Sequence, residues 1–103
     1  MGVPARRTWK YGITASVVQT QAGGTPLTME WNKILTANDS DAVTMPLAIE
    51  GMEVFIVNWS VNTIQIFPAI GDRLNANALN LPETLATLTT VNYKCMDRIF
   101  WHS

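Results

Sequence analysis

The segment Glu53–Asn75 reads EVFIVNWSVNTIQIFPAIGDRLN, and it decides the fold class of this chain. It contains two short runs of β-branched and aromatic residues, Val54–Val57 and Ile64–Phe67. The polar segment Asn58–Asn62 separates these runs, and a turn containing Pro and Gly follows the second one. Short runs bounded by Asn, Ser, Gly and Pro are typical of a β-hairpin or meander. We therefore expect two antiparallel strands joined by a turn.

The same kind of pattern recurs along the rest of the chain. Four further segments are rich in apolar and β-forming residues and are predicted as strands: 8–21, 27–35, 85–95 and 99–101. The spacing within 27–35 also fits a helix, so periodicity alone does not decide that segment. Pro46 makes 42–49 an edge strand or an extended loop, because proline cannot donate to a sheet. Together these segments predict an all-β fold, a small antiparallel β-sandwich, jelly roll or barrel.

The length of 103 residues fits one domain with one core. Residues 1–10 are predicted to form an extended N-terminal arm, because Gly2 and Pro4 disfavour regular structure there. Residues 11–103 are predicted to form a single β domain. Five residues are expected at structural turns in that domain: Gly51, Pro68, Gly71, Asp72 and Asn75.

The composition is unusually apolar for so small a chain. Hydrophobic residues make up 48% and charged residues only 15%, with a formal net charge of −1. Soluble proteins typically have about 25% charged residues. The surplus apolar surface predicts an oligomer. The charge balance argues against nucleic acid as a partner, and the absence of a long apolar run argues against a membrane.

Few residues are suited to catalysis or to metal binding. The single histidine, His102, is one residue from the C-terminus, and the single cysteine, Cys95, is expected to be a small buried side chain. Two carboxylate pairs flank apparent turns, where acidic residues usually bond backbone donors or face water: Glu50 with Glu53, and Asp39 with Asp41. We therefore expect no enzyme activity, no cofactor, no metal and no small-molecule substrate.

The aromatic residues have three possible uses in a chain of this size: filling the core, anchoring an interface, or presenting a platform for sugars. Five of them raise the question: Trp9, Tyr11, Trp31, Trp59 and Trp101. Trp59 lies in a predicted turn, where a role in the core is difficult to arrange. We expect it at a contact between subunits.

From residue 42 to residue 101 the order of features resembles a family of small virion proteins of tailed bacteriophages. The matching elements are Met45-Pro46, Gly51, the strand 54–58, Ile66-Phe67-Pro68, Gly71-Asp72, Leu74-Asn75, the Thr-rich segment 87–93 and Trp101. Phe67 stands where the family usually has Tyr, and Leu74 where it usually has Ile. The resemblance covers the C-terminal three-fifths of the chain.

The resemblance implies a capsid decoration or cement protein, which binds the outer shell of a phage head as a homotrimer and stabilises it. Its partners would be other copies of itself and the major capsid protein. It would be made in the host cytoplasm and reside in the virion. The candidates for contact with the capsid are Arg6, Arg7, Trp9, Lys10 and Tyr11. The candidates for the oligomer interface are Trp59, Ile64, Ile66 and Phe67.

Two other classes of function remain open at this point. One is a module of a tail or head fibre that recognises a host-surface glycan through Trp59 or Trp31. The other is a cytoplasmic regulatory β-barrel. A hydrolytic domain is not expected, because the chain has no plausible general base.

Overall fold

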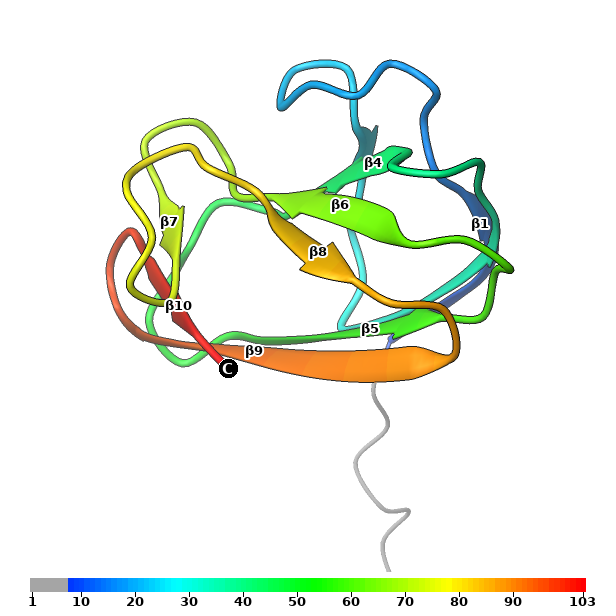
Figure 1. Cartoon of the computed structure of the whole chain (residues 1–103). Coiled ribbons are helices and arrows are strands. Elements are labelled where there is room, and N and C mark those ends of the chain that lie inside the picture. The colour runs from blue at the N-terminus through cyan, green and yellow to red at the C-terminus, as the bar shows by residue number, and fades with distance from the viewer. Residues whose placement is uncertain (1–7) are drawn as a thin grey trace, which may run out of the picture.

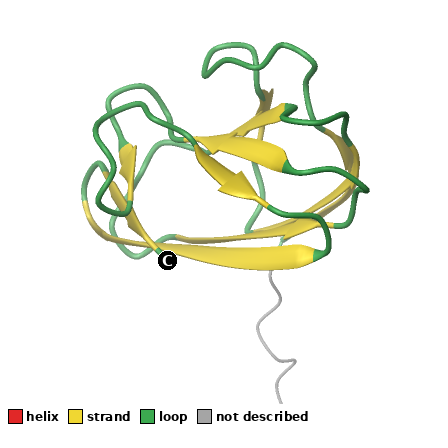
Figure 2. Cartoon of the chain, in the orientation of Figure 1, coloured by secondary structure: helices red, strands yellow, loops and turns green. Residues whose placement is uncertain are grey.

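The computed structural model describes residues 8–103, in which ten strands and no helix occur (Figures 1 and 2). The all-β prediction is therefore confirmed for the described part of the chain. The strands are β1 (Trp9–Thr14), β2 (Thr25–Pro26), β3 (Trp31–Thr36), β4 (Ala42–Thr44), β5 (Glu53–Asn58), β6 (Ile64–Phe67), β7 (Arg73–Leu74), β8 (Glu83–Leu85), β9 (Thr89–Asp97) and β10 (Phe100–His102).

The strands form two sheets, and the chain alternates between them as it advances. The larger sheet has the order β1-β3-β5-β9-β10-β7, and the smaller has the order β2-β4-β6-β8. In Figure 1 the smaller sheet lies above the larger one. We define a coil as two consecutive strands, one in each sheet. The chain forms three coils in this sense: β1–β2, β3–β4 and β5–β6. Successive coils stack on one another in the manner of a short solenoid.

Parallel pairing holds the three coils in register. In the larger sheet, Trp9 pairs with Trp31, and Trp31 pairs with Phe55. In the smaller sheet, Val43 of β4 pairs with Ile66 of β6, also in parallel orientation. A residue in one coil thus lies directly beside its equivalent in the next coil.

The predicted antiparallel hairpin between β5 and β6 is wrong. β5 lies between β3 and β9 in one sheet, whereas β6 lies between β4 and β8 in the other. The buried Asn58 stabilises this arrangement, because its side-chain amide donates to the carbonyls of Asn62 and Leu85 and so ties the end of β5 to the following turn and to β8. The two sheets are consequently mixed, and the purely antiparallel fold is not formed.

Antiparallel strands cover the end of the stack at the third coil. β8 runs antiparallel to β6, and β9 runs antiparallel to the whole length of β5, from Glu53 opposite Lys94 to Asn58 opposite Thr89. β10 then pairs with β9 and with the two-residue strand β7. At the opposite end of the stack, β1 and β2 are the edge strands of their sheets.

One hydrophobic core lies between the sheets. Its largest fully buried side chains come from both of them: Trp101, Tyr93, Ile34 and Ile56 from the larger sheet, and Val43, Ile64 and Ile66 from the smaller one. Cys95 is buried in the same cluster, as expected for a small side chain. Removing this apolar surface from water is the main stabilising contribution to the fold.

Several predicted segment boundaries differ from the structure. The strand expected over 8–21 ends at Thr14, and only Ala42–Thr44 of segment 42–49 is a strand. The predicted arm 1–10 also ends earlier, because Trp9 and Lys10 are paired with β3. The remaining part of that arm, residues 1–7, lies outside the described residues.

Three of the predicted turn residues, Gly51, Gly71 and Asn75, lie in turns, whereas Pro68 and Asp72 lie in the loop between β6 and β7. Gly51 and Gly71 both have a φ of 87°, and Asn75 has a φ of 53°. Glycine adopts this left-handed region without the clash that a Cβ atom brings. Asp72 is buried, and its carboxylate accepts a hydrogen bond from the backbone N–H of Ala48 at 2.8 Å. It therefore anchors a neighbouring loop and not its own turn.

Candidate docking surface

A continuous stack of four aromatic rings lies on the outer face of the larger sheet. The ring of Trp9 lies 4.8 Å from that of Trp31, and the ring of Trp31 lies 4.4 Å from that of Phe55. The ring of Tyr11 is also stacked with that of Trp9, at 5.3 Å between ring centroids. Interplanar angles of 8–25° make all three contacts face-to-face. The parallel register produces this stack, because it places one aromatic residue of each coil beside the next.

The stack has one open end, at the edge of the sheet. Trp31 is stacked with both Trp9 and Phe55, and Trp9 is stacked with both Tyr11 and Trp31. Tyr11 is the last ring, and 62% of its surface is exposed. Aromatic rings gain stability from offset face-to-face partners as well as from burial. The outer face of Tyr11 is thus the surface on which a further planar group would extend the stack.

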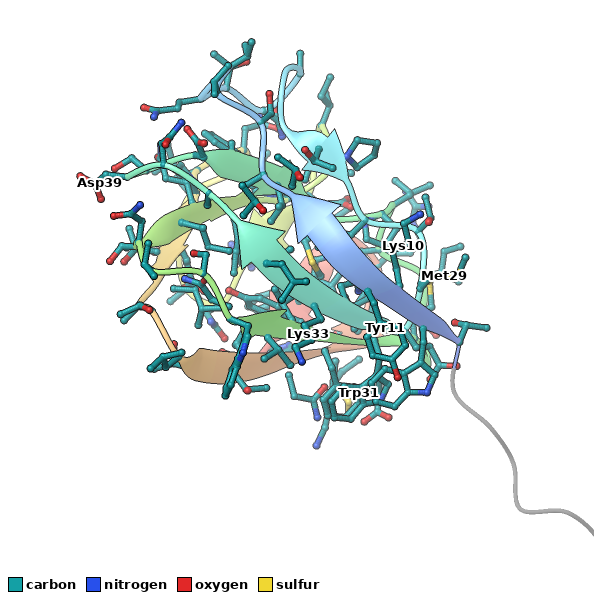
Figure 3. All side chains as sticks on the ribbon, turned by 90° about the vertical axis from the view of Figure 1, so that its right-hand side faces the viewer. Lys10, Tyr11, Met29, Trp31, Lys33 and Asp39 are labelled. Atoms are coloured by element: carbon teal, nitrogen blue, oxygen red, sulfur yellow. The ribbon has the colours of Figure 1, made fainter. Side chains whose placement is uncertain are left out.

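A β-bulge at Gly12 orients the side chains of β1. Gly12 has a φ of 67°, and the register with β3 shifts between Lys10 and Ile13. As a result Ile13 points into the core, although it follows Tyr11 by two residues. Lys10 and Tyr11 extend from opposite sides of the strand (Figure 3). β1 therefore carries its exposed rings on one face and an exposed cation on the other.

Three of the five predicted capsid-contact residues come together on this edge strand: Trp9, Lys10 and Tyr11. Arg6 and Arg7 lie outside the described residues. The sequence suggested these residues only as part of a basic arm. It raised Trp31 only as one of several aromatic candidates and did not group Trp31 or Phe55 with these residues, which only the parallel register brings beside Trp9.

The predicted oligomer-interface residues are divided by the structure. Ile64 and Ile66 are fully buried and Phe67 nearly so, because β6 is a central strand whose side chains fill the core. They offer no area to a second copy, so their proposed interface role is corrected to a role in the core. Trp59 is 54% exposed in the turn after β5, and the ammonium group of Lys33 lies 5.2 Å from its ring centroid.

A second, shorter stack lies at the other end of the same sheet. The ring of Phe100 lies 4.0 Å from that of His102, and the guanidinium group of Arg73 lies 4.2 Å from the Phe100 centroid. His102 is therefore part of β10, with its ring packed against Phe100 of the same strand, and is not a free tail residue. Its stacking partner is an apolar ring, with no nucleophile in the contact. This stack secures the short strands β7 and β10.

An open cleft of about 560 Å³ beside β8 contains the carboxylate of Glu83. That carboxylate accepts hydrogen bonds from the side-chain amides of Asn75 and Asn77 and from the hydroxyl of Tyr93, the last at 2.5 Å. A carboxylate has about four lone-pair positions, and these three donor groups already bond both of its oxygens. The cluster therefore ties the loop after β7 to β8 and β9, and it leaves neither oxygen of Glu83 unpaired.

The Tyr93–Glu83 pair predicts a stability change at high pH. Burial, followed by the hydrogen bond to Glu83, raises the pKa of Tyr93 above its ordinary value of about 10. Above pH 10 the unfolded chain loses this proton while the folded chain keeps it, so folding stability falls as pH rises. We expect the difference in unfolding free energy between the native chain and Tyr93→Phe to shrink by up to about 1.4 kcal/mol per pH unit.

Urea unfolding at pH 8, 10 and 11 measures this difference. Tyr11→Phe is the matched control for the loss of one hydroxyl, since Tyr11 is exposed. Equal pH slopes for the native chain and Tyr93→Phe above pH 10 would contradict the prediction.

The two carboxylates of the Asp39–Asp41 pair lie in different surroundings. Asp41 is buried and accepts a hydrogen bond from the backbone N–H of Asn38 at 2.8 Å, whereas Asp39 is exposed.

Burial and nearby Asp72 raise the pKa of the Cys95 thiol, which disfavours its thiolate. Across residues 8–103, no three His, Cys, Asp or Glu side chains are grouped so as to hold a metal ion.

Comparisons with known proteins give no relative for this chain. No protein-family model, no curated protein and no solved structure matches it. In the described part of the chain no helix is long and apolar enough to cross a membrane.

Proposed function

We propose that this chain is a bacteriophage decoration protein that binds the outer shell of the head as a homotrimer and stabilises it. The observation that supports this most is the exposed strand β1, on which Trp9, Lys10 and Tyr11 lie together at an open sheet edge. A protein that acts by adding contact area needs exposed apolar side chains at such a place. The resemblance in sequence to small virion proteins supplies the identity of the shell.

The trimer contact in this proposal is the turn after β5. Trp59 and Val61 project from it with 54% and 86% of their surfaces exposed, next to the outer face of the larger sheet. Exposed tryptophan is a frequent anchor at protein interfaces. We infer that this turn, and not β6, forms the contact between subunits of the trimer.

Cosedimentation of the purified protein with phage heads tests the proposal. We expect the native chain to pellet with the heads and the double variant Trp9→Ala/Tyr11→Ala to bind at least about tenfold more weakly, as for loss of an aromatic anchor. Leu79→Ala, an exposed apolar residue in another loop, is the matched control and should bind as the native chain does. Equal binding of the double variant and the control would contradict the proposal.

For the fold class we infer a short coil stack closed at one end by antiparallel strands, in place of the jelly roll or barrel. The parallel registers of β1, β3 and β5 support this class.

A second candidate function, recognition of a host-surface glycan, is supported by the exposed indole of Trp59. One side of its ring faces Lys33, and the exposed remainder has the character of a sugar-stacking platform. Trp31 is a poor platform, since its ring is stacked with both Trp9 and Phe55. Binding to a glycan array that is lost in Trp59→Ala would favour this function over shell binding.

A further inference from the structure

The backbone of β1 determines what can pair with its open edge. The N–H of Trp31 donates to the carbonyl of Thr8 at 2.9 Å, so Thr8 and, by alternation, Lys10 direct their backbone groups towards β3. The N–H and C=O groups of Trp9 and Tyr11 then point away from the sheet, on the side where, among residues 8–103, β1 has no neighbouring strand. An extended polypeptide supplies donors and acceptors at matching intervals.

The side chains of β1 determine the sequence of such a polypeptide. On the outer face, an incoming strand meets the exposed ring of Tyr11 at the end of the aromatic stack. On the opposite face it meets the exposed ammonium group of Lys10. Cross-strand aromatic pairs and pairs of opposite charge both stabilise a sheet. A complementary strand therefore has aromatic residues on one face and an acidic residue on the other.

The same geometry argues against a second copy of this chain on the edge. Antiparallel pairing of two β1 strands that placed Trp9 opposite Tyr11 would also place Lys10 opposite Lys10. Like charges directly opposite one another destabilise a pair of strands, and lysine on an edge strand is a common device against self-association.

We propose that β1 is a docking strand for an extended segment of another protein, one that carries an acidic residue opposite Lys10 and aromatic residues on either side of it. The segment adds a seventh strand to the larger sheet and extends the stack beyond Tyr11. The proposal specifies the contact with the shell more closely. It rests on the proposed function only for which protein supplies the segment, since the side chains and backbone of β1 alone determine the chemistry of the segment.

Short peptides test the chemistry directly. The probe is the capped peptide Thr-Trp-Glu-Trp-Thr, and its control is Thr-Trp-Lys-Trp-Thr. Binding to the full-length protein is followed by NMR through the backbone amide signals of Trp9 to Gly12. We expect the Glu probe to bind the native chain about two- to fivefold more tightly than the Lys probe, and this preference to reverse in Lys10→Glu. A preference that does not reverse, or no shift with either probe, would overturn the proposal.

Methylation of the probe backbone separates strand pairing from simple apolar contact. One version of the Glu probe is N-methylated at both Trp residues, and another at Glu. Antiparallel pairing with Glu opposite Lys10 requires the Trp amides, whereas parallel pairing requires the Glu amide. We expect one version to lose binding and the other to keep it, so that the result also gives the strand direction. Equal binding of both N-methylated versions would contradict the proposal.

Two further outcomes are distinguishable. If phage heads bind the protein but neither probe does, the docking strand is wrong while the proposed function stands. If the probes behave as expected but heads do not bind, the docking strand stands and its partner lies elsewhere. Broadening of the β1 amide signals with concentration, in the absence of any probe, would show that a second copy occupies the edge and overturn the choice of partner.

Discussion

Replacing Asn58 by alanine is expected to lower the free energy of unfolding by about 3 kcal/mol. Asn58 is fully buried, and its side-chain amide donates to the carbonyls of Asn62 and Leu85 at 2.8 and 2.9 Å. Its side-chain carbonyl accepts hydrogen bonds from both the backbone N–H and the hydroxyl of Ser60. Leaving such buried partners unpaired costs about 1–3 kcal/mol for each. Urea denaturation monitored by tryptophan fluorescence measures the loss.

Asn62→Ala is the matched control for this variant. The Asn62 side chain is only partly buried and donates a single hydrogen bond, to the carbonyl of Ala37. Its loss is expected to cost about 1 kcal/mol. If both variants lost the same stability, the crossing between the sheets would not depend on the buried amide of Asn58.

Replacing Trp101 by alanine is expected to cost about 3–5 kcal/mol, the range for removing a large buried aromatic side chain. Trp101 is the largest of the fully buried side chains and lies on β10, beside Cys95 of β9 and Leu74 of β7. Its removal leaves a cavity where the antiparallel strands close the stack. Thermal unfolding followed by circular dichroism measures the change.

Trp101→Phe separates the contribution of volume from that of the indole N–H. The Nε1 atom of Trp101 is buried and has no hydrogen-bond partner within the described residues. Phenylalanine removes that unpaired donor and keeps most of the ring, so we expect a loss of only about 1–2 kcal/mol. A loss as large as that of the alanine variant would show that Nε1 has an acceptor in solution.

The positions of the longer strands were predictable from sequence, but their pairing and the short strands β2, β7 and β8 were not. The runs within β5 and β6 have the β-branched and aromatic content that identifies a strand whatever its neighbour. A hairpin and a coil stack share this local pattern and differ in which distant strand supplies the hydrogen bonds. The buried Asn58 stabilises the arrangement found here, but its polar side chain is typical of an ordinary turn residue in the sequence.

The docking surface was predictable only in part, for a related reason. Trp9, Lys10 and Tyr11 stand together in the sequence, so they could be singled out as a group. Trp31 and Phe55 join them through parallel registers that no local pattern encodes. Conversely, Ile64 and Ile66 look the same in sequence whether they face a second copy or the core of their own chain. Because β6 lies between β4 and β8 in its sheet, these two side chains pack in the core of their own chain.

The two ends of the coil stack differ, and this difference limits how large an assembly can grow through its edges. At one end the edge strand β1 is six residues long, whereas at the other end the edge strands β7 and β8 have two and three residues. An assembly that grows head to tail needs matching surfaces at both ends of each unit. This chain can accept a strand at one end and has no comparable edge to offer at the other. A strand bound to β1 therefore ends the series after one addition, and the sheet cannot propagate into a filament.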